Sequence, residues 1–166
     1  FMELPVDPGG MLTLRDVYLH GRGDRAEWRE QNWTSVSAGG TLFAEHVRLH
    51  GTEPYYNISV GFANAGFAYL RDTWIGSSDS VTGAVIENTG TLVMEGGGVS
   101  TASLFSFDAL RNLGYANLDR VSISRNCGES VGATRGIVNY SGSVLNMANS
   151  VVARNGYGCP SRDPLG

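Results

Sequence analysis

The sequence predicts an all-β protein, a single-stranded right-handed parallel β-helix of about six coils with three short strands per coil. Two observations lead to this fold class. A pattern of inward apolar residues with period two, which is typical of a strand with one buried face, returns six times. The copies open near residues 10, 40, 66, 90, 114 and 143, at intervals of 30, 26, 24, 24 and 29 residues. A nearly constant spacing of this kind indicates stacked repeats, and none of the copies holds a convincing helical pattern.

The clearest copy runs from Gly114 to Asn126. Its small or apolar residues form two short runs of period two, separated by Asp119-Arg120, which we interpret as a bend between two strands. These inward residues are Ala116, Leu118, Val121 and Ile123. The equivalent residues elsewhere are Leu12, Leu14, Val17 and Leu19; Leu42, Ala44, Val47 and Leu49; Ala68, Leu70, Thr73 and Ile75; Leu92, Met94 and Val99; and Leu145, Met147 and Val152.

A third strand is expected before each new copy, where an apolar residue is followed two positions later by a small polar one. The pairs are Val36 with Ala38, Phe62 with Asn64, Ile86 with Asn88, Leu110 with Asn112, and Ile137 with Asn139. If each strand lies above its equivalent in the previous coil, Asn64, Asn88 and Asn112 stack about 4.8 Å apart. Their amides then hydrogen-bond to one another. Parallel crossovers are nearly always right-handed, which predicts the winding.

We expect one β-helix domain over residues 1–166, with residues 1–9 as an N-terminal cap. The absence of a signal peptide before Phe1 suggests that the chain is a piece of a longer protein. A net charge of −4 without a basic cluster argues against a nucleic-acid partner. No apolar run approaches the roughly 20 residues of a membrane span, and no motif calls for a cofactor.

The run from Gly136 to Asn155, which ends near Cys159, resembles the right-handed β-helix repeats of secreted and surface-anchored bacterial proteins. These include the polymorphic outer-membrane-protein type and related large adhesin-like proteins. The resemblance extends over all six copies. It implies the fold and a secreted or cell-surface location in a bacterium, but it implies no reaction.

The two cysteines, Cys127 and Cys159, each follow an Arg-Asn pair at the end of a second strand in neighbouring copies. We expect a disulfide that ties the last coil down, because a secreted chain permits one. A redox or metal-binding pair is the alternative, although the spacing fits no zinc motif.

In a stacked fold, surface function is read down columns of equivalent residues. The column after the first strand alternates in charge, which predicts a ladder of surface ion pairs: Arg15, Glu45, Arg71, Glu95 and Asp119. Each pair of this kind contributes about 0–1 kcal/mol.

We expect three further columns at outward positions of the second strand. They hold Asp16, His46 and Asp72; Tyr18, Arg48 and Trp74; and His20 with His50. Clustered imidazoles and carboxylates suit general acid–base chemistry or a metal. If the protein is an enzyme, the catalytic candidates are Asp16, His46, Asp72 and Arg48. His20 and His50 are the candidates for a divalent metal. The alternative is an ordinary solvated face.

The outward face of the first strand carries an apolar and aromatic strip: Phe43, Phe67, Tyr69, Val93 and Tyr115. Exposed strips of this kind usually mark a partner, a ligand groove or a covering segment. The candidate residues for binding a polysaccharide or cell-surface ligand are therefore Phe43, Phe67, Tyr69, Tyr115 and Trp74. Alternatively, the strip is covered by residues 22–35, by a neighbouring domain, or by a second copy in a homo-oligomer.

The sequence thus favours a non-catalytic β-helical stalk, or a carbohydrate- or surface-binding module, of a secreted bacterial protein. One alternative is an enzyme resembling polysaccharide lyases or hydrolases, or a fragment of one. Another is a self-associating oligomerisation module.

Overall fold

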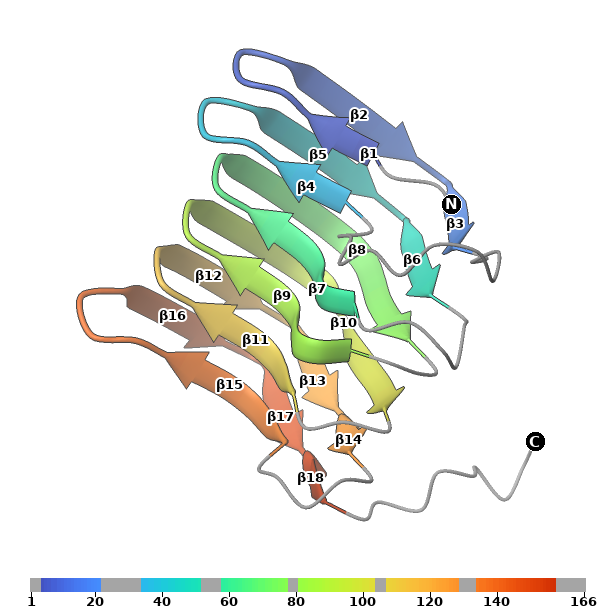
Figure 1. Cartoon of the computed structure of the whole chain (residues 1–166), viewed down its shortest axis with the longest axis vertical. Coiled ribbons are helices and arrows are strands. Elements are labelled where there is room, and N and C mark those ends of the chain that lie inside the picture. Colours follow the sequence, from blue (N-terminus) through green and yellow to red (C-terminus); the bar gives the residue numbers. More distant parts are fainter. Residues whose placement is uncertain are drawn as a thin grey trace.

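The structure, a computed structural model, is a parallel β-solenoid of about four turns whose wall contains two main parallel sheets (Figure 1). It describes residues 4–21, 34–51, 58–77, 81–103, 107–128 and 134–157. The predicted all-β parallel solenoid is therefore confirmed. Consecutive strands of each sheet come from consecutive sequence copies, so residues about two dozen apart lie side by side.

The first sheet contains the strands that precede each copy's opening residue. In spatial order these are β1 (Leu4–Val6), β4 (Thr34–Val36), β7 (Ile58–Asn64), β9 (Val81–Asn88), β11 (Asp108–Asn112) and β15 (Arg135–Asn139). The register follows the predicted pairs, since Leu110 is paired with Ile86 on one side and Ile137 on the other. Residues Leu4–Val6, which the sequence places in an N-terminal cap, form β1 and pair with β4.

The second sheet is built from the first strand of every copy. Its strands are β2 (Met11–Arg15), β5 (Thr41–Glu45), β8 (Phe67–Ser77), β10 (Thr91–Ser103), β12 (Tyr115–Asp119) and β16 (Val144–Ala148). Leu70 is paired with Met94, as the repeat spacing requires.

Shorter strands continue the wall beyond the bend. They are β3 (Tyr18–Gly21), β6 (Arg48–Gly51), β13 (Ser122–Ser124), β14 (Cys127–Gly128), β17 (Val151–Ala153) and β18 (Gly156–Tyr157). In the third and fourth copies no separate strand follows the bend, because β8 and β10 run through it as single strands of 11 and 13 residues. The expectation of three short strands in every coil is wrong for these two copies.

The bend between the two strands is a column of residues in the left-handed region of backbone conformation. Their φ angles are 53° at Asp16, 53° at His46, 44° at Asp72, 76° at Gly96, 56° at Arg120 and 51° at Asn149. Short polar residues and glycine tolerate this conformation best, and four of the six positions hold Asp, Asn or Gly. The predicted bend at Asp119-Arg120 therefore has a backbone cause that recurs in every copy.

The core is the column of inward apolar residues, which stack through the middle of the solenoid. Leu42, Leu70, Leu92, Met94, Leu118 and Ile123 are all at most 1% exposed. The last copy differs, because Met147 and Val152 are 40% and 44% exposed. No described coil lies beyond this copy to cover them.

The asparagine column forms the predicted ladder. Asn64 Nδ2 donates to Asn88 Oδ1, Asn88 Nδ2 to Asn112 Oδ1, and Asn112 Nδ2 to Asn139 Oδ1, each at 2.7 Å. Asn64, Asn88 and Asn112 are at most 2% exposed, so the ladder provides a partner for each of their buried Nδ2 groups, which would otherwise be costly to bury.

The corner next to this ladder requires glycine. A Cβ atom at Gly114 would overlap the carbonyl oxygen of Gly90, and one at Gly90 would overlap that of Gly66. This close stacking of backbones explains why the fourth and fifth copies open on glycine.

Candidate functional site

Three aromatic rings form a platform on the outward face of β5 and β8. We call Phe43, Phe67 and Tyr69 the aromatic platform. The ring of Phe43 lies 6.0 Å from that of Phe67 and 6.3 Å from that of Tyr69, with interplanar angles of 58° and 53°. These are favourable tilted geometries for aromatic pairs. Phe67 keeps 36% of its surface exposed, so the described residues leave part of the platform open.

The rest of the predicted strip is less continuous. Thr91 separates Tyr115 from Phe67 in the same column, and the partly buried Val93 follows Tyr69 in the neighbouring column. Tyr115 is 40% exposed, and its hydroxyl accepts a hydrogen bond from Asn146 Nδ2 at 3.1 Å. Tyr115 therefore lies two coils away from Phe67.

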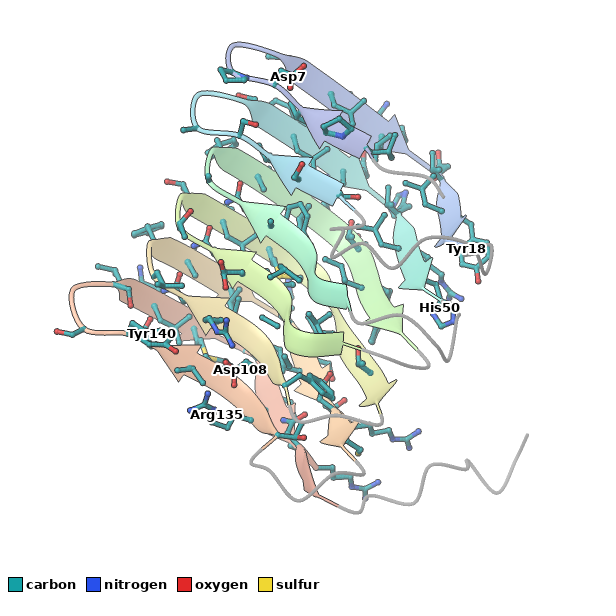
Figure 2. The ribbon with its side chains drawn as sticks, in the orientation of Figure 1. Asp7, Tyr18, His50, Asp108, Arg135 and Tyr140 are labelled. Carbon is teal, nitrogen blue, oxygen red and sulfur yellow. The ribbon has the colours of Figure 1, made fainter. Side chains whose placement is uncertain are left out.

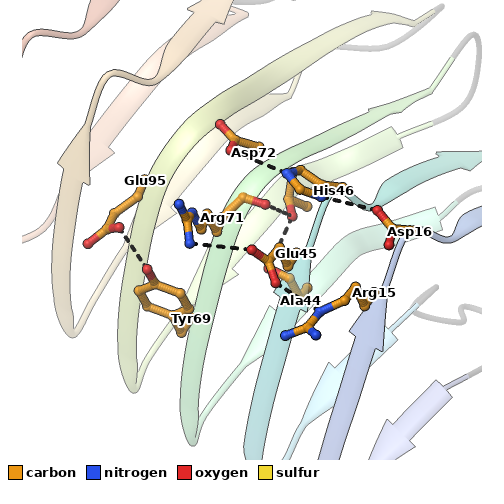
Figure 3. Close-up of polar contacts among 10 residues, drawn as sticks. Arg15, Asp16, Ala44, Glu45, His46, Tyr69, Arg71, Asp72 and Glu95 are labelled. Carbon is orange, nitrogen blue, oxygen red and sulfur yellow. Dashed lines mark hydrogen bonds and ion pairs between the residues drawn. The ribbon is translucent and has the colours of Figure 1, made fainter.

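A small groove of about 230 Å³ runs beside the platform. Phe43 and Tyr69 form its aromatic side, and the ladder of Arg15, Glu45 and Arg71 forms its charged side. Glu45 lies 2.9 Å from Arg15 Nε and 3.3 Å from Arg71 Nη1 (Figure 3). The predicted alternation of charge is confirmed over these three copies. Both arginine side chains are more than half exposed, so the ladder contributes little to stability.

The ladder changes character at its next two positions. Glu95 accepts a hydrogen bond from the Tyr69 hydroxyl at 2.7 Å. Asp119 pairs with its neighbour Arg120 at 3.1 Å, and Asn149 donates to it at 2.8 Å. The hydrogen bond from Asn149 is the main cause that lowers the pKa of Asp119.

The hydrogen bond to Glu95 is the main cause that raises the pKa of Tyr69 above its ordinary value of 10.0, with burial as the second cause. The hydroxyl therefore keeps its proton to a higher pH. We expect Glu95→Gln to move the pKa back down, because the carboxylate charge is removed. Ultraviolet titration of the tyrosines should show the change as a difference from the wild type, and Tyr69→Phe identifies which transition belongs to Tyr69. Identical titration curves for Glu95→Gln and the wild type would contradict the assignment.

The column of Asp16, His46 and Asp72 does not lie on the second strand, as the sequence suggested, but at the left-handed bend before it. His46 Nδ1 lies 3.1 Å from Asp16 Oδ1, and His46 Nε2 lies 3.7 Å from Asp72 Oδ2 (Figure 3). The imidazole thus spans two carboxylates along the stack instead of converging with them on one point. All three side chains are at least half exposed.

His20 and His50 are neighbours in the pairing of β3 with β6. The side chain of His20 lies outside what the structure describes, so a metal held by this pair stays a prediction. Among the described residues, no group of three or more His, Cys, Asp or Glu is placed to hold a metal ion.

A larger hollow lies beyond the bend, on the outward face of β6 and of the second half of β8. We call it the basic hollow; its volume is about 780 Å³. The described residues that line it are Tyr18, Arg48, Leu49, His50, Trp74, Ile75, Gly76, Ser100 and Arg125. Tyr18 and His50 mark its position at one edge of the solenoid (Figure 2). Trp74 and Arg48 therefore belong to this hollow, and not to the platform or to the Asp16–His46–Asp72 column.

Sequence reasoning missed an ion network on the first sheet that is centred on one buried carboxylate. The carboxylate of Asp108 is 2% exposed; it lies 2.9 Å from Arg111 Nε and 2.7 Å from Arg135 Nε. Arg111 also lies 3.0 Å from Glu87. Figure 2 shows Asp108 and Arg135 on neighbouring strands. The sequence does contain a signal, because the spacing of the copies places Asp108 in register with Arg135.

A second asparagine ladder begins beside the cysteines. Asn126 Nδ2 donates to Asn155 Oδ1 at 2.8 Å, and Asn155 Nδ2 donates to the Ile123 carbonyl at 2.9 Å. The sulfur of Cys127 is 3.8 Å from the Arg154 carbonyl of the next copy. Cys159 lies outside the described residues, so its disulfide with Cys127 stays a prediction.

Comparison with known proteins gives no relative: no protein-family model, curated protein or solved structure matches the chain. Within the described ranges, no helix is both long and apolar enough to cross a membrane.

Proposed function

We propose that the chain is a non-catalytic binding module of a secreted or cell-surface bacterial protein, and that its aromatic platform binds a polysaccharide. The observation that carries this proposal is the contact of Phe43 with both Phe67 and Tyr69. Together they place three rings on an outward sheet face that is still partly open. An apolar face of this kind is usually covered by a ligand or a partner.

The surroundings of the platform favour a sugar over a dry protein interface. Hydroxyl-bearing Thr13, Thr41 and Thr91 occupy neighbouring positions in the same two columns. The charged ladder of Arg15, Glu45 and Arg71 runs along one side. A pyranose ring has C–H groups on its faces, which pack on aromatic rings, and hydroxyls at its edge, which need hydrogen-bonding groups nearby. The platform and its flanks offer both.

The proposal also includes the number of coils and the handedness of the solenoid, which we infer to be six coils with a right-handed winding. Six strands stack in the first sheet and six in the main path of the second, in the order of the six sequence copies, which supports this count. The general preference of parallel β-crossovers supports the right-handed winding. Such a rod would hold its binding face at a fixed distance from whatever anchors it.

The bend column supports a non-catalytic role. A general base needs a ring nitrogen directed at a substrate proton. Both nitrogens of His46 face carboxylates of neighbouring coils, and the site is an exposed corner outside both cavities.

The proposal is tested by affinity electrophoresis and calorimetry against neutral soluble polysaccharides. Phe67→Ala is expected to weaken binding about tenfold, the loss of roughly one ring-stacking contact. Tyr140→Ala is the matched control, because Tyr140 is 42% exposed and lies outside the platform. Equal binding by the wild type and Phe67→Ala would overturn the proposal. So would a wild-type dimer in light scattering that Phe67→Asp converts to a monomer, because the strip would then be an interface between two copies.

A further inference from the structure

We propose that the basic hollow is a second binding site, specific for an anionic sugar unit that carries a carboxylate or sulfate. The indole of Trp74 would pack on the sugar ring, and Arg48 and Arg125 would bind the anionic group. This inference rests on the hollow alone. It holds whether or not the aromatic platform binds a polysaccharide.

The hollow exists because large outward residues give way to small ones along two columns of the wall. The first column runs from Tyr18 through Arg48 and Trp74 to Gly98 and Ser122. The second runs from His50 to Gly76 and Ser100. A Cβ at Gly98 would overlap the Ser122 carbonyl oxygen and would also lie 2.8 Å from Trp74 Cζ3. A Cβ at Gly76 would overlap the Ser100 carbonyl oxygen. Both positions therefore accept only glycine, and no side chain projects from the wall at either of them.

The described lining is positively charged, although the chain as a whole has a net charge of −4. Arg48 and Arg125 contribute guanidinium groups, His50 contributes an imidazole, and none of the described lining residues is acidic. Arg125 sits at a corner with φ of 59°, which fixes where its side chain leaves the backbone. A locally basic hollow on an acidic protein selects an anion by charge.

Arg48 is positioned for planar recognition. It lies in register between Tyr18 and Trp74, so its neighbours on both sides are aromatic at strand spacing, about 4.8 Å. Its side chain is exposed, and no hydrogen bond or ion pair joins it to another residue in the described part of the chain. A guanidinium presents a planar fork that matches the two oxygens of a carboxylate or sulfate.

The aromatic residues restrict the ligand further. Trp74 and Tyr18 are 42% and 61% exposed, which leaves broad faces available for a ring. A bare inorganic anion would use only the arginines, whereas a sugar acid uses both kinds of group. The volume of about 780 Å³ lies within the range of about 300–1,000 Å³ typical of small-ligand sites.

The test compares charged and uncharged forms of one chain. Calorimetry with an alginate oligouronate and its carboxyl-reduced form tests carboxylate recognition; dextran sulfate and dextran test sulfate recognition. Binding of at least one charged form, with at least tenfold weaker binding of its neutral counterpart, is the expected result. Equal affinity for the charged and neutral forms, or no binding of either charged form, would overturn the proposal. Tighter binding of a single-stranded oligonucleotide would also overturn it, because the hollow would then be a nucleic-acid site.

Variants locate the site. Arg48→Gln and Trp74→Ala are each expected to weaken binding of the charged glycan at least tenfold. Thermal melting, monitored by circular dichroism, checks that both variants are folded. Arg120→Gln is the matched control, because it removes the same charge from another exposed arginine that lies outside both the hollow and the platform. An equal loss in Arg120→Gln would mean nonspecific attraction and would overturn the proposal. The same titrations are repeated in the Phe67→Ala background, which removes the contribution of the aromatic platform and so separates the two sites.

Discussion

Replacing Asn88 by alanine is expected to lower the free energy of unfolding by about 2–6 kcal/mol. Asn88 donates to Asn112 Oδ1 at 2.7 Å and to the Tyr115 carbonyl at 2.9 Å, and it accepts from Asn64 at 2.7 Å. The substitution removes all three bonds at a position that is 0% exposed. Each buried polar group left without a partner costs about 1–3 kcal/mol, and at least two are left.

Urea denaturation measures this loss, and the same column supplies the control. Asn139 occupies the equivalent position in the last copy but is exposed, so water replaces what Asn139→Ala removes. We expect a loss of about 1 kcal/mol or less for Asn139→Ala. Similar losses of unfolding free energy in the two variants would show that the contribution of the ladder to stability does not depend on its burial.

Replacing Asp108 by alanine is the second large expected effect, a loss of about 1.5–3 kcal/mol, the usual contribution of hydrogen bonds to charged groups. Asp108 joins two arginines from β11 and β15, and its side chain is only 2% exposed. Burial acts to lower the pKa of Arg111, but hydrogen bonds to Asp108 and Glu87 outweigh it and the pKa is raised. Without Asp108, the partly buried Arg111 keeps Glu87 and the Gly83 carbonyl as its partners.

Glu45 is the matched control for Asp108, because it also pairs with two arginines but on an exposed surface. Urea denaturation of Glu45→Ala should show a change within about 1 kcal/mol. If Asp108→Ala costs no more than Glu45→Ala, the network on the first sheet is an ordinary set of surface ion pairs.

Most of the fold could be predicted because its signals are local and repeated. The period-two pattern defines which residues face inward, and the spacing of copies sets which strands pair. Together they give the neighbours of Leu70 and the ladder through Asn88. The bend was also visible, as a polar break at Asp119-Arg120, because a left-handed corner favours the same few residue types in each copy.

The surface sites were harder to predict for physical reasons. A left-handed residue at the bend interrupts the alternation of side chains between the two faces of a strand. His46 was therefore expected on the second strand and not at the bend, although Asp16 and Asp72 were correctly predicted as its neighbours in adjacent copies. The basic hollow lies beside Gly76 and Gly98, which carry no side chains. A sequence pattern of apolar and charged residues does not reveal an empty volume. The exposure of Met147 depends on whether another segment packs against the last described coil, and the sequence of that coil does not reveal this.

The asparagine ladder also gives the solenoid a direction. At each of the three steps of the ladder the amide donates towards the C-terminal coil, so the side-chain dipoles add along the axis as peptide dipoles do in an α-helix. The oxygen end of this array is the buried Oδ1 of Asn64, which has no hydrogen-bond partner among the described residues, since Val36 lies next in register. The rod is therefore electrically polar, with its partial negative pole near Asn64 and its partial positive pole near Asn139.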